Sequence, residues 1–266
     1  MDPMIKLLGI PFDANSSFLR GPALAPPAIR AMENEGSANT SAENGAEITA
    51  GRSHIDLGDM HFTDHDPHKA YLAIKERVAH ELTPGDKLVS IGGDHSISYP
   101  IIEAHAAKFH GLHVLHLDAH ADLYQNFDDN PYSHASPFAR LMEKNLLGSL
   151  TQVGIRTLNA HQRAQAARYK VNVVEMKDFN LSFLDKLAAP LYLSVDMDVL
   201  DPSHAPGVSH HEPGGLPMRG LLHIIQSLPI APIGADLVEY NPVRDIHHMT
   251  AMVGYKLVKE IIAKML

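Results

Sequence analysis

Short apolar runs alternate along the chain with longer stretches in which apolar residues recur every three or four positions. The short runs predict buried strands and the longer stretches predict amphipathic helices. Strands are predicted at 4–8, 87–91, 112–117, 151–155, 171–175, 190–195 and 230–235, and helices at 24–33, 67–82, 97–109, 136–146, 159–168, 217–227 and 243–264. Such alternation indicates an α/β protein, with a parallel sheet covered by helices on both faces.

One stretch, 34–52, is built of small and polar residues and predicts a surface excursion. Beyond it we find no internal repeat and no second apolar core. We therefore expect a single domain over 1–266.

Composition narrows the class of protein. The 266 residues contain no cysteine, which excludes disulfides and thiolate zinc sites. The net charge is −9 without a long Lys/Arg run, so we expect no nucleic-acid partner. No run of about 18 apolar residues occurs, so no membrane span is expected. The first residues do not resemble a signal peptide, and we expect a cytoplasmic protein.

Polar clusters follow four of the predicted strands. They lie at 91–96 (IGGDHS), 118–123 (DAHADL), 194–202 (SVDMDVLDP) and 235–242 (ADLVEYNP). In open parallel sheets, ligands bind beyond the carboxyl ends of the strands. The acids and imidazoles of these clusters should therefore converge at one edge of the sheet.

The residue types in these clusters predict a metal site. An Asp after a strand is often a helix N-cap and a lone His is usually structural, but four buried acids together would repel one another without cations. Their charge of −4 calls for two divalent ions, which could supply a hydroxide nucleophile. Oxygen and imidazole donors without sulfur favour Mn²⁺, with Zn²⁺, Co²⁺ or Ni²⁺ as alternatives. The candidate ligands are His95, Asp118, His120, Asp122, Asp196 and Asp198.

Other catalytic motifs are missing from the sequence. It has no G-x-x-x-x-G-K-[ST], no G-x-G-x-x-G and no G-x-S-x-G, so nucleotide-binding loops and serine nucleophile elbows lack support.

Taken together, the clusters resemble the ureohydrolase family of arginases and agmatinases. The resemblance rests on GGDHS at 92–96, DAHADL at 118–123, SVDMDVLDPSHAPG at 194–207, EPGGL at 212–216, VEYNP at 238–242 and RGPALAPPAIR at 20–30. It implies a three-layer α/β/α sandwich around an eight-stranded parallel sheet, two Mn²⁺ ions, and a homo-trimer or homo-hexamer.

The same resemblance implies roles for the metal ligands. Asp118 and Asp196 would bridge the two ions. His95 and Asp122 would complete one site, and His120 and Asp198 the other. Asp122 would also help to stabilise the tetrahedral intermediate, as a catalytic residue.

Two further residues acquire catalytic roles from the resemblance. Glu239 would pair with the substrate guanidinium, which a carboxylate can bind through two parallel hydrogen bonds. His134 would carry a proton to the leaving amine. The chain departs from the family at Ala135, where Gly is usual, and at Thr157, where arginases carry an Asp that contacts the α-amino group.

These features predict hydrolysis of a linear guanidino C–N bond to urea and an amine. The departures favour agmatine or another amine-ended guanidine over arginine. The expected partner is thus a small cationic guanidine, for which the substrate-binding candidates are Glu239, His134, Asn126, Asp128, Asp129, His210 and His211.

Other functions stay open at this point. A formiminoglutamase-like enzyme or a guanidino-acid hydrolase would use the same chemistry. A single-zinc deacylase would not need His120 and Asp198, and a non-catalytic metal-binding scaffold would not need Glu239.

Overall fold

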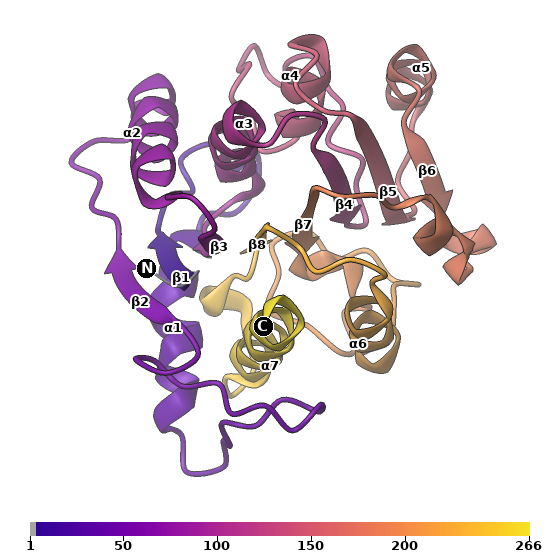
Figure 1. The fold of residues 1–266 in the computed structure, drawn as a ribbon. Helices are drawn as coiled ribbons and strands as arrows, with labels where there is room; N and C mark the ends of the chain where they lie inside the picture. Colours follow the sequence, from indigo (N-terminus) through magenta and orange to yellow (C-terminus); the bar gives the residue numbers. More distant parts are fainter. Residues whose placement is uncertain (1–3) are drawn as a thin grey trace.

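A computed structural model describes residues 4–266 and contains one eight-stranded sheet (Figure 1). All strand pairs are parallel, in the order β2-β1-β3-β8-β7-β4-β5-β6. The strands are β1 (Ile5–Ile10), β2 (Ile55–Asp59), β3 (Lys87–Gly92), β4 (His113–Leu117), β5 (Ser149–Ile155), β6 (Asn172–Glu175), β7 (Leu191–Asp196) and β8 (Gly234–Val238).

Helices cover both faces of this sheet, so the predicted three-layer α/β/α architecture is confirmed (Figure 1). One face carries α2 (Pro67–Glu81), α3 (Ser98–Lys108), α4 (Pro137–Glu143) and α5 (Ala160–Tyr169). The other carries α1 (Ala25–Ala31), α6 (Met218–Ser227) and α7 (Met249–Met265). Each interface between helices and sheet holds its own cluster of buried apolar side chains, which is why the central strands are apolar on both faces.

The order of the strands places four of them at the centre of the sheet. β2 lies on one side of β1, at the edge of the sheet, and β3 lies on the other side of β1. The chain then forms β4, β5 and β6, with β6 at the opposite edge, and finally places β7 and β8 between β4 and β3. The strands β3, β8, β7 and β4 are therefore neighbours, and these are the strands that the four polar clusters follow.

Most predicted elements match the structure closely, but two are shifted and one strand was missed. The edge strand β2 was not predicted. The strand predicted at 230–235 is β8 and lies at Gly234–Val238. The helix predicted from 243 begins at Met249, because 242–244 form a 3-10 turn and His247 and His248 have left-handed backbone conformations.

The sequence predicts a surface excursion over 34–52, but in the structure this segment packs against the body of the protein. Ala42 and Ile48 are buried in the apolar cluster beneath α7. Glu43 forms hydrogen bonds with Arg219 on α6 through both carboxylate oxygens, at 2.7 and 3.0 Å. The backbone N–H of Glu43 also donates to Glu260 on α7.

Within residues 4–266, no helix combines the length and the apolar character needed to cross a bilayer.

Candidate metal centre and active site

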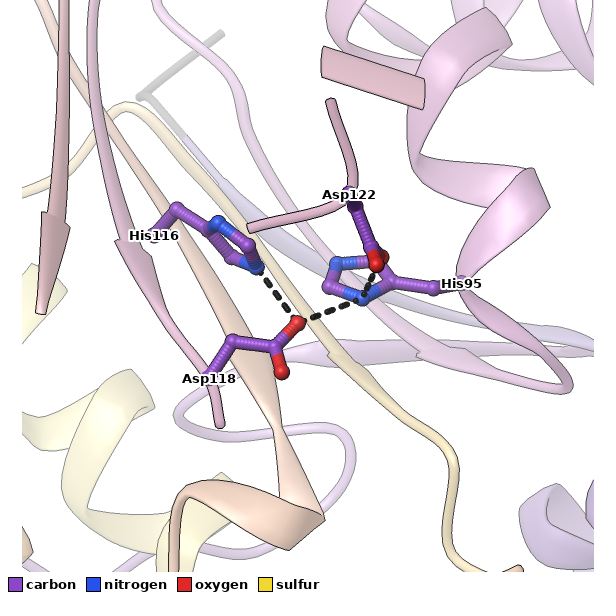
Figure 2. Close-up of side chains that lie close together, drawn as sticks. All are labelled: His95, His116, Asp118 and Asp122. Carbon is purple, nitrogen blue, oxygen red and sulfur yellow. Dashed lines mark hydrogen bonds and ion pairs between the residues drawn. The ribbon is translucent and has the colours of Figure 1, made fainter. Parts of the chain in front are cut away.

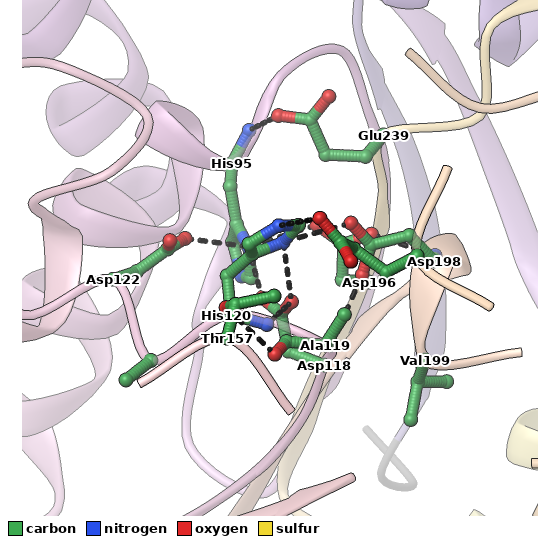
Figure 3. A network of polar contacts seen from close by, with 12 residues as sticks. His95, Asp118, Ala119, His120, Asp122, Thr157, Asp196, Asp198, Val199 and Glu239 are labelled. Atoms are coloured by element: carbon green, nitrogen blue, oxygen red, sulfur yellow. Dashed lines mark hydrogen bonds and ion pairs between the residues drawn. The ribbon is translucent and has the colours of Figure 1, made fainter. Parts of the chain in front are cut away.

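Three aspartates and a histidine meet at the carboxyl ends of the central strands (Figures 2 and 3). His95 follows β3, and its Nδ1 lies 3.1 Å from a carboxylate oxygen of each of Asp118, Asp122 and Asp196. The His95 side chain is 1% exposed and Nδ1 has no hydrogen-bond partner of good geometry. A bare ring nitrogen that faces three carboxylate oxygens is the donor set of a divalent cation.

A second group of donors shares one of these aspartates. His120 Nδ1 lies 2.9 Å from Asp198 Oδ2 and 3.4 Å from Asp118 Oδ1. The other oxygen of Asp118, Oδ2, is the one that faces His95. Asp118 therefore directs one oxygen into each group, as a carboxylate that bridges two ions must.

Two site residues have backbone conformations that are uncommon outside glycine. Asp122 has φ +50° and Glu239 has φ +64°. Both lie where the chain turns sharply after a strand, and the turn at Asp122 brings it back toward His95 despite the four positions that separate it from Asp118. Left-handed conformations of this kind persist only where the surrounding structure imposes them, and they concentrate at functional sites.

Beneath the candidate ligands, a row of buried polar side chains crosses five adjacent strands. Parallel pairing places Gln152 beside His116, His116 beside Ser194, Ser194 beside Asp236, and Asp236 beside Ser90. All five residues have 0% exposure. His116 and Ser194 precede Asp118 and Asp196 by two residues, so strand alternation puts each on the same face as its ligand.

The contacts of this row fix the tautomers of two histidines. Ser194 Oγ donates to Asp236 Oδ1 at 2.6 Å, so it accepts from His95 Nε2 at 3.1 Å, which leaves His95 Nδ1 bare. Burial raises the pKa of Asp236. Its carboxylate nevertheless accepts hydrogen bonds from the hydroxyls of both Tyr192 and Ser194, which fits its role as an acceptor. The row of buried polar side chains thus leaves Nδ1 of His95 free to bind a cation.

His116 lies close enough to be counted among the ligands, and sequence reasoning overlooked it. Its Nε2 is 2.7 Å from Asp118 Oδ2 (Figure 2). Gln152 Nε2 donates to the Ala121 carbonyl at 2.6 Å and lies 3.0 Å from His116 Nδ1. Because the carbonyl can only accept, the amide nitrogen must face it, and Nδ1 accepts. The proton of His116 therefore sits on Nε2 and points at Asp118, so His116 positions the bridging carboxylate and is not a ligand.

Glu239 and His134 form a second pair at the edge of the donor groups. His134 Nδ1 lies 2.8 Å from Glu239 Oε1. The same oxygen accepts the backbone N–H of His95 at 2.9 Å, a contact that Figure 3 shows. Burial lowers the pKa of His134, but the charge of Glu239 and its hydrogen bond outweigh burial and raise the pKa to about 9. On the other side of the ring, Nε2 contacts the N–H of Ser17 at 3.1 Å and its Oγ at 2.8 Å.

A cavity of about 230 Å³ opens over these groups. Of the predicted residues it includes His134, Glu239, His120, Asp122, Asp196, Asp198 and His210 in its lining, and it adds Ser17, Tyr124, Phe127, Ala135, Thr157, Gln162 and Glu212. His95 and Asp118 lie beneath the cavity, fully buried.

Four predicted substrate-binding residues are placed elsewhere. Asn126, Asp128 and Asp129 are exposed on the loop after Asp122, and within 126–129 only Phe127 lines the cavity. His211 is exposed and contacts the Pro206 carbonyl, whereas its neighbour His210 lines the cavity. Ser17 and Gln162 were missed because they lack a local signal and are ordinary loop or helix residues in the sequence.

The electrostatics of the site fit a pair of cations. Burial and then the charges of Asp198 and Asp118 raise the pKa of Asp196 well above its usual value. The carboxylates are therefore costly to ionise together without an added positive charge. Two divalent cations held by the His95 and His120 groups, with Asp118 shared, would remove that cost.

An eight-stranded α/β/α fold with two such donor groups at the carboxyl ends of its central strands defines a metal-dependent hydrolase. Comparison with known proteins narrows this class. A model of the arginase family matches residues 4–263, and the chain belongs to that family. It is a hydrolase that acts on C–N bonds of linear amidines, of the arginase and agmatinase type.

Three relatives show the range of similarity. "Arginase 1, mitochondrial" of Arabidopsis thaliana is 45% identical over 97% of this chain and 80% of its own length. "Agmatinase" of Bacillus anthracis is 31% identical over 97% of this chain and 90% of its own length. The solved structure "Arginase from Medicago truncatula" superposes with a TM-score of 0.93 at 41% identity, covering 99% of this chain and 87% of that one.

Proposed function

We propose that this chain hydrolyses the guanidino group of arginine to urea and ornithine, with two divalent cations, Mn²⁺ first among them. The observation that carries the proposal is the division of Asp118 between the His95 and His120 groups. A shared carboxylate of this kind serves two ions about 3.5–4 Å apart, the arrangement of binuclear hydrolases.

The chain's own residues supply binding and proton transfer. When bound, the two cations would lower the pKa of a water molecule and so provide the nucleophile at neutral pH. His95, Asp122, Asp118 and Asp196 would hold one cation, and His120 and Asp198 would hold the other with the two shared aspartates.

Glu239 is suited to the substrate guanidinium. The contacts that it makes with His134 and with the His95 backbone both use Oε1. We assign Oε2 to a guanidinium N–H, which orients the carbon of the guanidino group above the donor groups. A charge-assisted bond of this kind gives direction as well as affinity.

His134 is placed to deliver a proton. The departing amine needs one proton to leave, and the raised pKa of His134 keeps its ring protonated near neutral pH. Ser17 offers its hydroxyl as an acceptor to the protonated ring and its N–H as a donor to the neutral ring, so both states of the shuttle have a partner at Nε2.

The preference for arginine rests on the comparisons. The sequence favoured agmatine because Thr157 replaces an acid. However, the relatives at 42–45% identity are named arginases, whereas the agmatinase is 31% identical. Agmatine remains the second candidate, because no Lys or Arg among residues 4–266 lines the cavity to bind an α-carboxylate.

A urea-release assay decides between these substrates. The protein would be reconstituted with Mn²⁺ and supplied with arginine, agmatine and 4-guanidinobutyrate, and turnover of formiminoglutamate would be followed in parallel through the formamide that it releases. We expect the highest kcat/KM with arginine. Faster turnover of agmatine would transfer the proposal to the second candidate, and no turnover of any compound by protein loaded with two metals would favour the non-catalytic scaffold.

Three further properties remain predictions. A cytoplasmic location, a homo-trimer or homo-hexamer, and a single domain over 1–266 follow from the sequence analysis and are part of this proposal. The two relatives from Arabidopsis thaliana carry mitochondrial or chloroplastic locations in their names.

A further inference from the structure

We propose that Glu212 is the specificity residue of this active site and binds the ammonium group at the far end of the substrate from the guanidinium. The inference rests on the proposed function and deepens it. It explains how a chain with Thr157 in place of an acid could still recognise an amine.

Among the residues that the structure describes, one carboxylate in the lining of the cavity has no part in the chemistry above. Asp122, Asp196 and Asp198 belong to the metal ligands, and Glu239 serves His134 and the guanidinium. Glu212 also lines the cavity, and its side chain is 40% exposed. Its nearest basic group among the described residues is His120, whose Nε2 lies 3.9 Å from Oε1, and it forms no ion pair with a Lys or Arg there.

The backbone of Glu212 is held firmly, which fixes where its carboxylate can reach. Arg156 donates from Nε and Nη2 to the Glu212 carbonyl at 2.9 and 2.6 Å. The same Nη2 donates to the Asp198 carbonyl at 2.6 Å, which ties Glu212 to the turn that carries a metal ligand.

The glycines after Glu212 complete this attachment. The N–H groups of Gly214 and Gly215 donate to Asp201 Oδ2. A Cβ at Gly215 would lie 2.6 Å from the backbone nitrogen of Asp201, so the two segments pack too closely for any larger residue. A carboxylate on a backbone fixed at both sides can bind a ligand without first paying the entropy of ordering a loop.

The position relative to Thr157 supports the same role. Arg156, which grips Glu212, is the residue just before Thr157, and Thr157 and Glu212 line the same cavity. The Thr157 hydroxyl donates to the Ala119 carbonyl at 3.1 Å and adds no negative charge. The acid absent at 157 is thus supplied from a different loop, to the same cavity.

The test uses two guanidines that differ only in the terminal ammonium. Agmatine carries it, and N-butylguanidine has a hydrogen atom in its place. For Glu212→Gln, we expect KM for agmatine and for arginine to rise about tenfold or more, as for loss of a hydrogen bond to a charged group. KM for butylguanidine should change less than about twofold, and kcat should hold for all three.

A matched control and a second readout separate the alternatives. Glu76→Gln makes the same charge change on the exposed surface of α2 and should leave every KM unchanged. The content of bound Mn²⁺ should stay at the wild-type value in Glu212→Gln. If instead metal is lost and kcat falls equally for all substrates, Glu212 acts through His120 and the proposal is wrong.

Binding measurements keep this inference separate from the proposed function. Calorimetry of the Mn²⁺-loaded protein would compare putrescine, a diamine without a guanidino group, with butylamine. Weaker putrescine binding in Glu212→Gln, with butylamine binding unchanged, supports the ammonium site even if the wild type releases no urea. Equal binding of putrescine by the wild type and the variant would overturn it.

Discussion

At the residue scale, the site depends on hydrogen-bond partners that decide where protons sit. His95 and His116 are both buried imidazoles beside the same carboxylate, yet only one has a bare nitrogen for a cation. Ser194 fixes the tautomer of His95, and Gln152 fixes the tautomer of His116. Mutation of such a partner commonly weakens metal binding by about 10–100-fold.

Gln152→Met tests this assignment. The change keeps the volume but leaves His116 Nδ1 and the Ala121 carbonyl without a donor. We expect a loss of about 1–3 kcal/mol in the free energy of unfolding and metal binding weaker by about 10–100-fold. Calorimetric Mn²⁺ titration and denaturant unfolding measure the two effects. Gln125→Met, at an exposed position, is the control; unchanged Mn²⁺ affinity in Gln152→Met would refute the positioning role.

Ser17→Ala tests the proton shuttle. The variant keeps the N–H that faces His134 Nε2 and loses the hydroxyl that accepts from the protonated ring, so the pKa of His134 should fall below about 9. If the protonated ring is the acid, activity is lost as pH rises through that pKa. The alkaline limb of the kcat/KM profile should therefore move to lower pH by about one unit.

The neighbouring serine provides the control for this shift. Ser16 Oγ contacts Asp94 and not His134. Ser16→Ala should leave the alkaline limb in place. An identical profile for Ser17→Ala and the wild type would mean that Ser17 does not stabilise the protonated shuttle.

Sequence reasoning identified most of the charged site residues, but neither Glu212 nor the uncharged partners. Asp and His clusters after strands stand out because acids are rare in apolar surroundings. Ser17 and Gln162 reach the cavity only through tertiary packing, which a local pattern does not encode. Conversely, Asp128 and Asp129 looked suitable for a cationic substrate, but the fold turns them to solvent.

At the element scale, the strands and helices that were misjudged share a physical cause. The strand β2 reads IDLGD and is mostly exposed at the edge of the sheet, so it lacks the apolar alternation of a strand. In β8, Asp236 is buried in mid-strand and was taken for a strand end, although Tyr192 and Ser194 satisfy its carboxylate. Both the exposure of an edge strand and the hydrogen bonding of a buried charge depend on neighbouring strands, so a local sequence pattern does not reveal them.

The segment 34–52 allows a prediction at the same scale. The hydrogen bonds from Arg219 and Gln226 lower the pKa of Glu43 to about 2. A lowered carboxyl pKa stabilises the fold above the usual value near 4.5, and this contribution disappears as pH falls through about 2. Because the Arg219 side chain is 70% exposed, the pair should contribute only about 0.2–1 kcal/mol.

Glu43→Gln should therefore act mainly on the local attachment of this segment. We expect faster amide hydrogen exchange over 41–49 at neutral pH, with a change in global stability of at most about 1 kcal/mol. Glu47→Gln is the control, because Glu47 is 64% exposed and its only ion pair in the described chain, to Arg52, spans 3.9 Å. Equal exchange rates in wild type and Glu43→Gln would show that apolar burial alone holds the segment.

At the scale of the whole molecule, the fold accumulates negative charge at its centre. Strand order brings β3, β8, β7 and β4 together, and with them the four candidate ligand carboxylates, which are at most 7% exposed. The cost of this charge falls on the folded state, since the unfolded chain keeps its acids apart in water. Two bound cations should therefore stabilise the entire fold as well as enable chemistry.

Metal removal tests this directly. At free Mn²⁺ of about 100 times Kd, each site adds about 2.7 kcal/mol to the free energy of unfolding, so two sites should raise Tm by roughly 10 °C. Chelation should reverse the shift, and Mn²⁺ should restore it at two ions per chain.

Asp118→Asn should abolish most of the shift because it alters both sites, whereas His120→Ala should keep about half. Asp128→Asn, which removes an exposed acid, should behave as wild type. A shift that saturates at one ion per chain, or that is equally small in Asp118→Asn and His120→Ala, would contradict a shared carboxylate.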